Sequence, residues 1–486
     1  MIMPTGFYIG TVLWGLLYLG IAWQVIRSRS EPDAKSMWLL FFALLPPVAI
    51  IIYLLVGIDY RRPGVRMRLH GRTLALFRRQ VTPEMKERYF SDRFLSLVDE
   101  PFRPLARLLR SCGEGNFVHA GNSFEIITSG LRKRELLLED IRRAQKYIHI
   151  EYFRFGNDKA GCEVRDLLLQ KAAEGVEVRF INNNMIGRNI PRKFFRQMQE
   201  GGIEVLPYTH IRNGWRSWLM RINCQNHRKI VVIDGKVAYT GGMNLNDNYF
   251  YKWRDTHLRI TGPVIASLQV AFVDNWLSCG GSLTYPLSHY MVIPLKGEDA
   301  PLKDKLVQVV TDAAENPWPA TQLGYEWILG NARDYVYIQT PYFVPPTSFL
   351  HALKGAALRG VDVRLMLPRK VDTPLIGPAN RSVYAECLEA GVRIFERSGA
   401  FIHSKTLVAD DGVCIIGASN LDMRSFNLNN EINTVVYDRE TALACKAIFL
   451  GDQGAVEELH LQPWLAERKW YDSLFSRFMR LFYRLL

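Results

Sequence analysis

The body of this chain repeats itself, and the repeat limits the possible folds more than any other feature of the sequence. From about residue 123 onward, strand-like segments rich in β-branched and aromatic residues recur in the same order in two halves. The matched pairs are 146–153 with 335–343, 175–181 with 360–366, and 202–206 with 391–395. Helix-like stretches separate the strands, which predicts βαβ units and a largely parallel sheet in each half. We therefore predict two α/β lobes that face each other.

Each half also carries one copy of the motif H-x-K-x4-D. The copies consist of His227, Lys229 and Asp234, and of His403, Lys405 and Asp410. Further residues match at equal distances from the histidine: Gly241 and Gly417 follow it by 14 residues, Asn244 and Asn420 by 17, and Asp255 and Glu431 by 28. His and Lys two residues apart on a strand point to one face of a sheet. Two lobes would therefore supply two histidines, two lysines, two asparagines and two acids.

This set of residues is suited to phosphodiester exchange. One neutral imidazole attacks phosphorus and forms a phosphohistidine, while the other gives a proton to the leaving alkoxide and then takes one from the incoming hydroxyl. The motif lysines hold the phosphoryl oxygens together with the phosphate-binding residues Asn244 and Asn420. Buried carboxylates fix the histidine tautomers, a role that we assign to Asp255 and Glu431. The near-symmetric half-sites leave either histidine as the nucleophile.

The motif aspartates complete the set of candidate catalytic residues, but both stand before turn signals. Gly235 follows Asp234, and Asp411 and Gly412 follow Asp410. Such sequences are typical of tight turns between strands. We therefore expect both aspartates to cap hairpins, and a structural role is favoured for them.

Two stretches near the N-terminus carry no charged side chain. They run from Gly6 to Ile26 and from Met37 to Ile58. A helix needs about 20 apolar residues to cross a bilayer, so the two stretches and their short polar link predict a transmembrane hairpin. A cleaved signal peptide is the alternative, but no Lys or Arg precedes Gly6. Pro46 and Pro47 are expected to kink the second helix.

Three other features indicate a membrane setting. The link 27–36 carries three basic residues and 59–78 carries six, which places the large C-terminal part on the cytoplasmic side by the positive-inside rule. The first half has 13 extra residues within 208–226, rich in Trp and Arg, which favours an interfacial segment or a lid. Residues 471–485 have an apolar helical face opposite arginines, which predicts a basic amphipathic helix on anionic lipid. Docking of that helix on the protein body is the alternative.

Composition excludes several other classes of protein. A chain of 486 residues that is 48% hydrophobic is neither disordered nor collagen-like. Its seven cysteines form no CxxC pair, so no zinc or thioredoxin motif is present, and we expect no metal and no cofactor. A net charge of +13 indicates an anionic partner: a phosphate-bearing substrate, a nucleic acid or a lipid surface.

The duplicated motif, with its downstream Gly and Asn, resembles the phospholipase D superfamily. The segments 45–57, 340–345, 367–370 and 420–425 make the whole chain similar to bacterial cardiolipin synthases. The resemblance implies that two phosphatidylglycerols give cardiolipin and glycerol without a nucleotide or metal, and that His227 and His403 are the catalytic pair. The sequence departs from the family's pattern at Gly242 and Ala418, where the family commonly has Ser or Thr.

The resemblance and the apolar stretches together predict an α/β protein with two pseudo-symmetric phospholipase D-like lobes that share one active site. The expected units are a transmembrane hairpin (1–60), a basic juxtamembrane linker region (61–122), a first lobe (123–300), a second lobe (301–462) and a C-terminal basic amphipathic helix (463–486). We expect a multi-pass protein of the bacterial cytoplasmic (inner) membrane, whose partners are phosphatidylglycerol and anionic lipid rather than nucleic acid.

Three other functions use or mimic the same features. A phospholipase D-type hydrolase would use the same residues with water as acceptor, and only exclusion of water separates it from a transferase. A nuclease of the same superfamily would suit the basic charge, but the apolar stretches and the Trp-rich insertion argue against it. A non-catalytic lipid-binding protein would be expected to have lost part of one motif, and both are complete.

Overall fold

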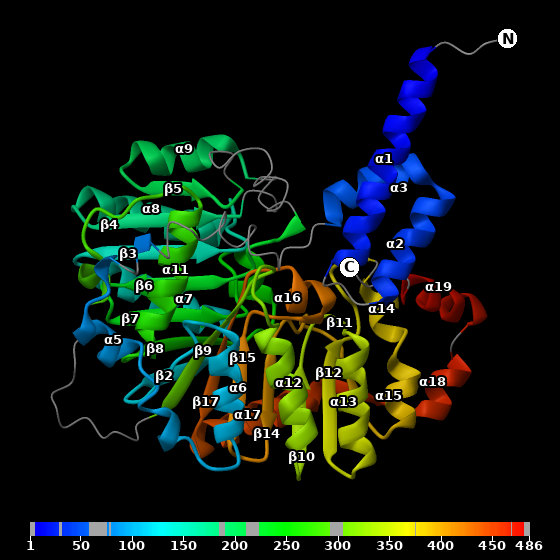
Figure 1. Cartoon of the computed structure of the whole chain (residues 1–486). Coiled ribbons are helices and arrows are strands. Elements are labelled where there is room, and N and C mark those ends of the chain that lie inside the picture. The colour runs from blue at the N-terminus through cyan, green and yellow to red at the C-terminus, as the bar shows by residue number, and fades with distance from the viewer. Residues whose placement is uncertain are drawn as a thin grey trace.

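The computed structural model describes residues 5–28, 32–57, 75–76, 79–183, 190–209, 223–291, 305–374, 376–467 and 469–480. Two α/β lobes form the body, and the N-terminal helices stand beside them (Figure 1). Most of the Trp-rich insertion (210–222) and of the basic segment after the second apolar stretch (58–74 and 77–78) lies outside the described residues.

The first lobe contains a seven-stranded sheet in the order β2-β8-β7-β6-β3-β4-β5. The strands are β2 (Ser123–Ile127), β3 (Tyr147–Tyr152), β4 (Glu177–Asn182), β5 (Glu204–Pro207), β6 (Lys229–Ile233), β7 (Val237–Gly241) and β8 (His257–Thr261). The accompanying helices are α7 (Gly130–Arg143), α8 (Lys159–Ala173), α9 (Arg192–Glu200) and α11 (Ile265–Ser278).

The second lobe repeats this arrangement. Its sheet runs β1-β9-β17-β15-β14-β10-β12-β13-β18, and the seven inner strands correspond one by one to those of the first lobe. The strands are β1 (Val118–His119), β9 (Leu306–Asp312), β10 (Tyr335–Gln339), β12 (Asp362–Pro368), β13 (Arg393–Arg397), β14 (Thr406–Ala409), β15 (Val413–Gly417), β17 (Glu431–Tyr437) and β18 (Val456–Leu459). A separate pair is formed by β11 (Phe343–Val344) and β16 (Leu421–Asp422).

The helices of the second lobe are α12 (Ala320–Asn331), α13 (Thr347–Leu358), α14 (Ile376–Arg381), α15 (Tyr384–Glu389), α16 (Met423–Asn427) and α17 (Arg439–Asp452). The turns that follow α8 and α13 contain Gly175 and Gly360, with φ of 89° and 90°. This left-handed conformation favours glycine. Equal backbone angles at matched positions show that the repeat extends to the turns.

Each sheet is mixed, so the prediction of a largely parallel sheet was wrong. Within the two large sheets, only β3, β4 and β5, and their counterparts β10, β12 and β13, pair in parallel. The strand after the motif histidine pairs antiparallel to the first of these. A tight turn joins it to the next antiparallel strand, in β6–β7 and β14–β15, and a longer connection leads to the third, β8 or β17. The aspartate turns that were expected from the sequence reverse the chain direction at these points.

An apolar cluster joins the two lobes. Side chains of the first sheet, such as Ile230 and Val232, belong to the same buried cluster as Val408 and Ile416 of the second sheet. Residues of α11 and α17 complete this cluster. Burial of so much apolar surface between the sheets fixes the lobes face to face, as the repeat predicted.

Residues 61–122 do more than link two parts of the chain. Their described part contains α5 (Pro83–Tyr89), the short helix η1 (Leu95–Leu97), α6 (Arg103–Cys112) and β1. Leu105 and Leu109 of α6 lie in the core of the second lobe, and β1 pairs with β9. The segment therefore completes the second lobe, and a description of it as a linker region is too simple, because its apolar helix face is buried.

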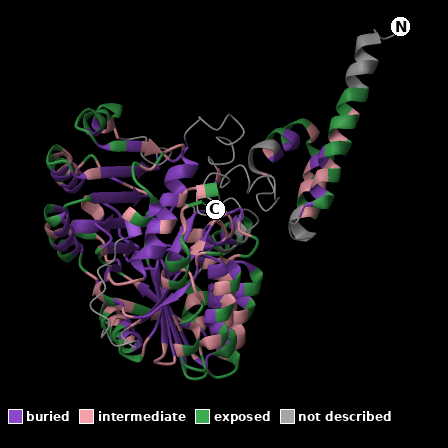
Figure 2. Cartoon of the chain, turned by 60° about the vertical axis from the view of Figure 1, so that its left-hand side comes forward, coloured by how far each residue is buried: buried purple, intermediate pink, exposed green. Residues whose placement is uncertain are grey.

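The N-terminal helices are α1 (Thr5–Arg27), α2 (Pro32–Leu44) and α3 (Pro46–Val56). The second apolar stretch breaks at Leu45, because Pro46 and Pro47 begin a new helix, and the expected kink is confirmed. The three helices share a small core that includes Val25, Phe42 and Tyr53, and their outer face is exposed (Figure 2). Within the described ranges, none of the helices has both the length and the apolar character that a membrane crossing requires.

The chain ends in α18 (Leu461–Glu467) and α19 (Trp470–Arg480). Met479 of α19 is buried against Ala379 of α14 and Val344 of β11. Trp470, Leu474 and other large apolar side chains of α19 remain exposed. The helix therefore docks on the body, as in the alternative given above, and still presents an apolar surface. Residues 481–486 lie outside the described residues.

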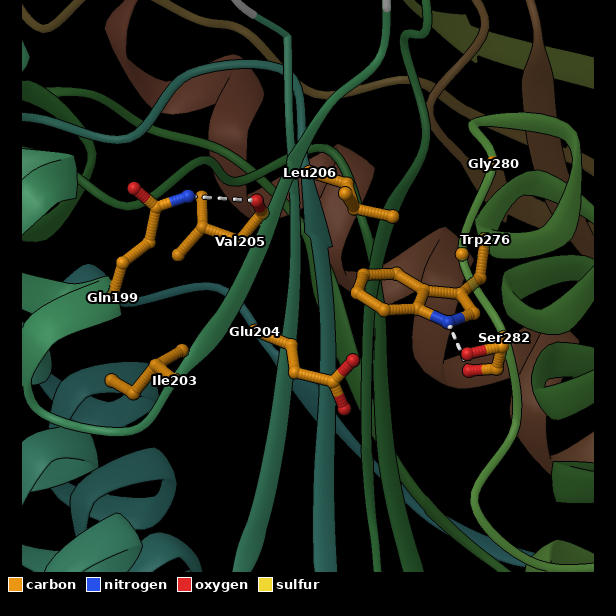
Figure 3. Close-up of a pocket in the computed structure, with 9 residues that line it drawn as sticks. Gln199, Ile203, Glu204, Val205, Leu206, Trp276, Gly280 and Ser282 are labelled. Carbon is orange, nitrogen blue, oxygen red and sulfur yellow. Dashed lines mark hydrogen bonds between the residues drawn. The ribbon is translucent and has the colours of Figure 1, made fainter. Parts of the chain in front are cut away.

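A pocket of about 330 Å³ lies at the free edge of the first sheet, beside β5 (Figure 3). Trp276 donates its indole N–H to the Ser282 carbonyl at 2.9 Å, and the Gln199 amide donates to the Val205 carbonyl at 3.3 Å. None of the motif residues lines this pocket. Its polar groups have partners within the chain, so the chemistry of the protein has to be sought between the lobes.

Candidate active site

Two short backbone contacts between the lobes hold the motif histidines in place. Residues 226 and 430 form one isolated parallel bridge, and residues 254 and 402 form the other. The His227 amide donates to the Asn430 carbonyl at 2.9 Å, and the His403 amide donates to the Arg254 carbonyl at 2.7 Å. The first bridge therefore places His227 beside Glu431, and the second places His403 beside Asp255.

The histidine–carboxylate pairs are crossed between the lobes. His227 Nδ1 lies 2.9 Å from Glu431 Oε1, and His403 Nδ1 lies 2.7 Å from Asp255 Oδ2. All four side chains are buried. A carboxylate on Nδ1 favours the tautomer that leaves Nε2 available for chemistry. The structure thus brings together all four predicted residues, and neither lobe holds a complete pair by itself.

The motif lysines are buried beside their own histidines. Lys229 Nζ donates to the His227 carbonyl at 2.6 Å. Lys405 Nζ also contacts the His403 backbone carbonyl and lies 3.1 Å from Nε2 of its ring. Both ammonium groups therefore lie where they could contact the oxygens of a phosphoryl group held between the imidazoles.

The motif asparagines present polar atoms that have no partner among the described residues. Asn244 Oδ1 accepts from the Arg154 amide at 3.0 Å, which orients the side chain, while its Nδ2 is buried without a hydrogen bond. Asn420 is buried with one amide atom similarly unpaired. Buried polar groups are usually satisfied, so these atoms suit a polar ligand.

The motif aspartates lie at the far ends of the strands and serve the fold. Asp234, with φ of 53°, accepts backbone N–H groups of residues 145, 146 and 147 at 2.8, 2.8 and 2.9 Å. Asp410, with φ of 47°, accepts those of residues 333, 334 and 335 at 2.8, 3.0 and 3.0 Å. These carboxylates anchor the start of β3 and β10, which agrees with the structural role favoured for them and not with their inclusion among the catalytic residues.

The glycine at position 242 has a steric explanation. A Cβ atom at Gly242 would collide with the Asp255 carboxylate, which is bonded to His403. Ala418 occupies the matching position in the second lobe, where the acid is the longer Glu431. The absence of a side chain at Gly242 therefore makes room for the acid of the opposite half-site.

Burial and positive charge keep the imidazoles neutral. Burial lowers the pKa of His227 and His403 well below the usual value, and the ammonium groups of Lys229 and Lys405 lower it further. A neutral imidazole is the form that attacks phosphorus. An anionic phosphate between the histidines would oppose this effect and favour protonation of one of them, as acid catalysis requires.

Burial also shifts the pKa values of the acids and lysines of the site. It raises the pKa of Asp255 to about 6 and that of Glu431 to about 7. It lowers the pKa of Lys405 to about 8 and that of Lys229 well below its usual value. Asp255, Glu431 and Lys405 thus have pKa values near neutral pH, which is common where chemistry takes place. Among the described residues, no group of three or more His, Cys, Asp or Glu side chains is arranged to hold a metal ion.

The structure adds residues that the motif analysis missed. The Tyr249 hydroxyl lies 3.4 Å from His403 Nε2, and Phe153 packs edge-on against His227 at 4.6 Å between ring centroids. Lys133, fully buried on α7, donates to the Met243 carbonyl at 2.8 Å and so supports the loop that carries Asn244. These residues lie outside the H-x-K-x4-D motif and its matched Gly, Asn and acid positions, so the motif did not reveal them.

Comparison with known families agrees with this geometry. The family model described as cardiolipin synthase, PLD-like domain matches residues 137–276 and 327–452. A second model, described as phospholipase D-nuclease N-terminal, matches residues 16–57. Both catalytic motifs lie within the first model. The fold and the site thus define a two-lobed phospholipase D-like protein.

Curated relatives cover nearly the whole chain. The major cardiolipin synthase ClsA of Bacillus subtilis is 32% identical over 458 residues, which is 92% of each chain. Cardiolipin synthase 2 of Staphylococcus epidermidis is 35% identical over 453 residues, which is 90% of each chain. The chain therefore belongs to the bacterial cardiolipin synthase family.

A solved structure has the same fold. Phosphatidylserine synthase of Haemophilus influenzae superposes with a TM-score of 0.57 at 17% identity, covering 79% of this chain and 98% of that one. At this identity the likeness concerns the fold alone. It agrees with two phospholipase D-like lobes joined face to face.

The crossed pairs predict equal sensitivity of both half-sites to loss of the carboxylate. We expect Glu431→Gln and Asp255→Asn each to slow phosphatidyl transfer from phosphatidylglycerol by about 10²–10⁴-fold, because the imidazole loses its orienting charge. Initial rates by mass spectrometry, with circular dichroism as a check of folding, measure this. The control Glu125→Gln, an exposed acid on β2, should leave the rate unchanged. A decrease of less than threefold in both variants would contradict an orienting role.

The lowered pKa of Lys405 predicts an alkaline decline in kcat/KM. The ammonium is present below about pH 8 and is lost as the pH rises through that value. A phosphate-binding charge then disappears from the free enzyme. Lys405→Arg keeps its charge and should move the decline to higher pH, whatever its effect on the maximal rate. The control Lys236→Arg, on an exposed turn, should keep the wild-type profile. If the alkaline decline of kcat/KM occurred at the same pH in Lys405→Arg, the decline would have to be assigned to another group.

Proposed function

We propose that this protein is a cardiolipin synthase, which transfers a phosphatidyl group from one phosphatidylglycerol to another and releases glycerol. The observation that carries the proposal is the pair of complete, crossed histidine–carboxylate units in a chain of the cardiolipin synthase family. The 32–35% identity to curated cardiolipin synthases over about 90% of the chain supports the substrate class.

In the first step, Nε2 of one histidine attacks phosphorus of the donor lipid. The new P–N bond forms as the P–O bond to the leaving glycerol breaks, and the second histidine gives that oxygen a proton. Glycerol leaves, and a phosphatidyl group remains on the first imidazole. Lys229, Lys405, Asn244 and Asn420 would stabilise the charge on the phosphoryl oxygens.

In the second step, a glycerol hydroxyl of the acceptor phosphatidylglycerol attacks the same phosphorus. The second histidine, now neutral, takes the hydroxyl proton, and the electron pair of the broken P–N bond returns to the first imidazole. Cardiolipin is released and both histidines regain their starting states. Asp255 and Glu431 would stabilise whichever imidazole carries positive charge.

Hydrolysis to phosphatidic acid is the second candidate, since water could replace the acceptor hydroxyl without any change in the residues. The names of the relatives favour the transferase.

We further propose that the protein works at the bacterial cytoplasmic membrane, with its N-terminal helices in contact with lipid and its lobes on the cytoplasmic side. Leu16, Leu19 and Leu44 are 62%, 64% and 69% exposed, so α1 and α2 offer apolar surface that lipid would cover. The exposed side chains of α19 extend this surface at the C-terminal end. A multi-pass hairpin is the arrangement that the two charge-free stretches predict.

The reaction is tested by incubating the purified protein in detergent with labelled phosphatidylglycerol alone. We expect cardiolipin and glycerol in equal amounts, and a loss of both in His227→Ala and in His403→Ala, because each step needs both imidazoles. Mass spectrometry of the lipids identifies the products. Phosphatidic acid without cardiolipin would identify a hydrolase instead, and unchanged activity in either variant would remove that histidine from the mechanism.

The role of α19 is tested by replacing Trp470, Leu474 and Phe475 with serine. We expect cardiolipin formation in phosphatidylglycerol vesicles to fall at least about tenfold relative to mixed micelles, because burial of each large side chain in lipid contributes about 1.5–3 kcal/mol. The control Leu358→Ser removes an exposed leucine of α13 and should keep the ratio. A vesicle-to-micelle activity ratio of the triple variant equal to that of the wild type would refute lipid contact by this helix.

A further inference from the structure

The two half-sites match in their histidine, lysine and asparagine but differ at one position next to them. Tyr147 and Tyr335 occupy equivalent places, since each donates its amide to the motif aspartate of its lobe. Seven residues further along the chain lie Arg154 in the first lobe and Tyr342 in the second. The next residue in each lobe is a phenylalanine, Phe155 or Phe343. Phe155 makes a parallel backbone contact with Leu245, and Phe343 makes one with Leu421. Both leucines directly follow the motif asparagine of their lobe. Arg154 and Tyr342 are therefore structural counterparts.

Arg154 lies at the active site and has hydrogen-bonding capacity to spare. Its amide binds Asn244 Oδ1 at 3.0 Å, which ties its backbone to a phosphate-binding residue. The side chain is half-buried, and its Nε is buried with no hydrogen-bond partner among the described residues. Its positive charge also lowers the pKa of His227 and His403, after the larger effects of burial and the two lysines. An unpaired buried guanidinium nitrogen beside a phosphate site suits an anionic ligand.

Tyr342 offers the second half-site no comparable charge. Its hydroxyl donates to Asp372 Oδ1 at 2.6 Å, and its ring lies 6.5 Å from that of His403. Burial raises the pKa of this phenol above its usual value, so it stays neutral. At this pair of equivalent positions, the cation is therefore found only in the first lobe, and the two sides differ there in the ligand that they favour.

We propose that Arg154 binds the phosphate of the acceptor lipid and so makes the site prefer an anionic phospholipid hydroxyl over a neutral alcohol or water. This inference rests on the proposed function. The reacting phosphate already has two lysines and two asparagines, while the acceptor arrives with a second negative charge that these groups do not neutralise. The planar fork of an arginine matches two phosphate oxygens. Bound there, the acceptor directs its glycerol hydroxyl to phosphorus of the phosphohistidine. A new P–O bond forms as the P–N bond breaks, its electron pair returns to the imidazole, and the hydroxyl proton passes to the other histidine.

The test is a competition between two acceptors for the same phosphatidyl-enzyme. Labelled phosphatidylglycerol in detergent is incubated with a fixed concentration of ethanol, and mass spectrometry gives the ratio of cardiolipin to phosphatidylethanol. We expect this ratio to fall about 10- to 100-fold in Arg154→Gln, as loss of a hydrogen bond to a charged group predicts. Arg154→Lys keeps a charge without the fork and should give an intermediate ratio.

The ratio separates this role from the alternatives. If Arg154 served the donor phosphate or only the fold, both products would fall together and the ratio would stay within twofold of the wild type, which would overturn the proposal. Arg165→Gln, a half-buried arginine of α8 paired with Asp166, is the matched control and should keep the ratio. The wild-type protein must first form both products, since a wild type that makes no cardiolipin refutes the proposed function itself.

Discussion

The active site depends on two backbone contacts between the lobes. The amides of His227 and His403 each donate to a carbonyl of the opposite lobe, and this places each imidazole against a carboxylate of that lobe. An error of about one ångström in the packing of the sheets would separate both pairs. The apolar cluster between the sheets therefore serves catalysis as well as stability, because it sets the distance on which both pairs rely.

The buried charges explain why such a site would be selective for anions. The two lysines and two histidines lie beside the carboxylates of Asp255 and Glu431, and burial disfavours the charged forms of these six groups. A phosphodiester between the lobes would add a negative charge that favours the protonated forms of the lysines and of one histidine. Binding of the substrate would therefore also prepare these groups for the reaction.

Much of the fold and of the candidate site could be predicted from the sequence, because the same residue types recur at the same spacing in both halves. The motif offsets identified the histidines, lysines, asparagines and acids, and the turn signals identified the structural role of Asp234 and Asp410. The crossing of Asp255 to His403 could not be predicted, since equal spacing in both halves is compatible with pairs within a lobe. The mixed sheet was missed because the strand after each histidine looks the same in either direction. Arg154 and Tyr342 could have been found by counting from Tyr147 and Tyr335 without a gap.

The crossed arrangement also bears on how the two halves have diverged. A chain with one lobe would lack the carboxylate for its own histidine and could build this site only by pairing with a second copy of itself. In such a pair, any change on one side would appear on the other. Joining the lobes in one chain removes that restriction, so Arg154 and Tyr342 could become different. The two lipids of the proposed reaction play unequal parts, because one gives its phosphatidyl group and the other its hydroxyl. A site whose two halves differ can bind each of them differently.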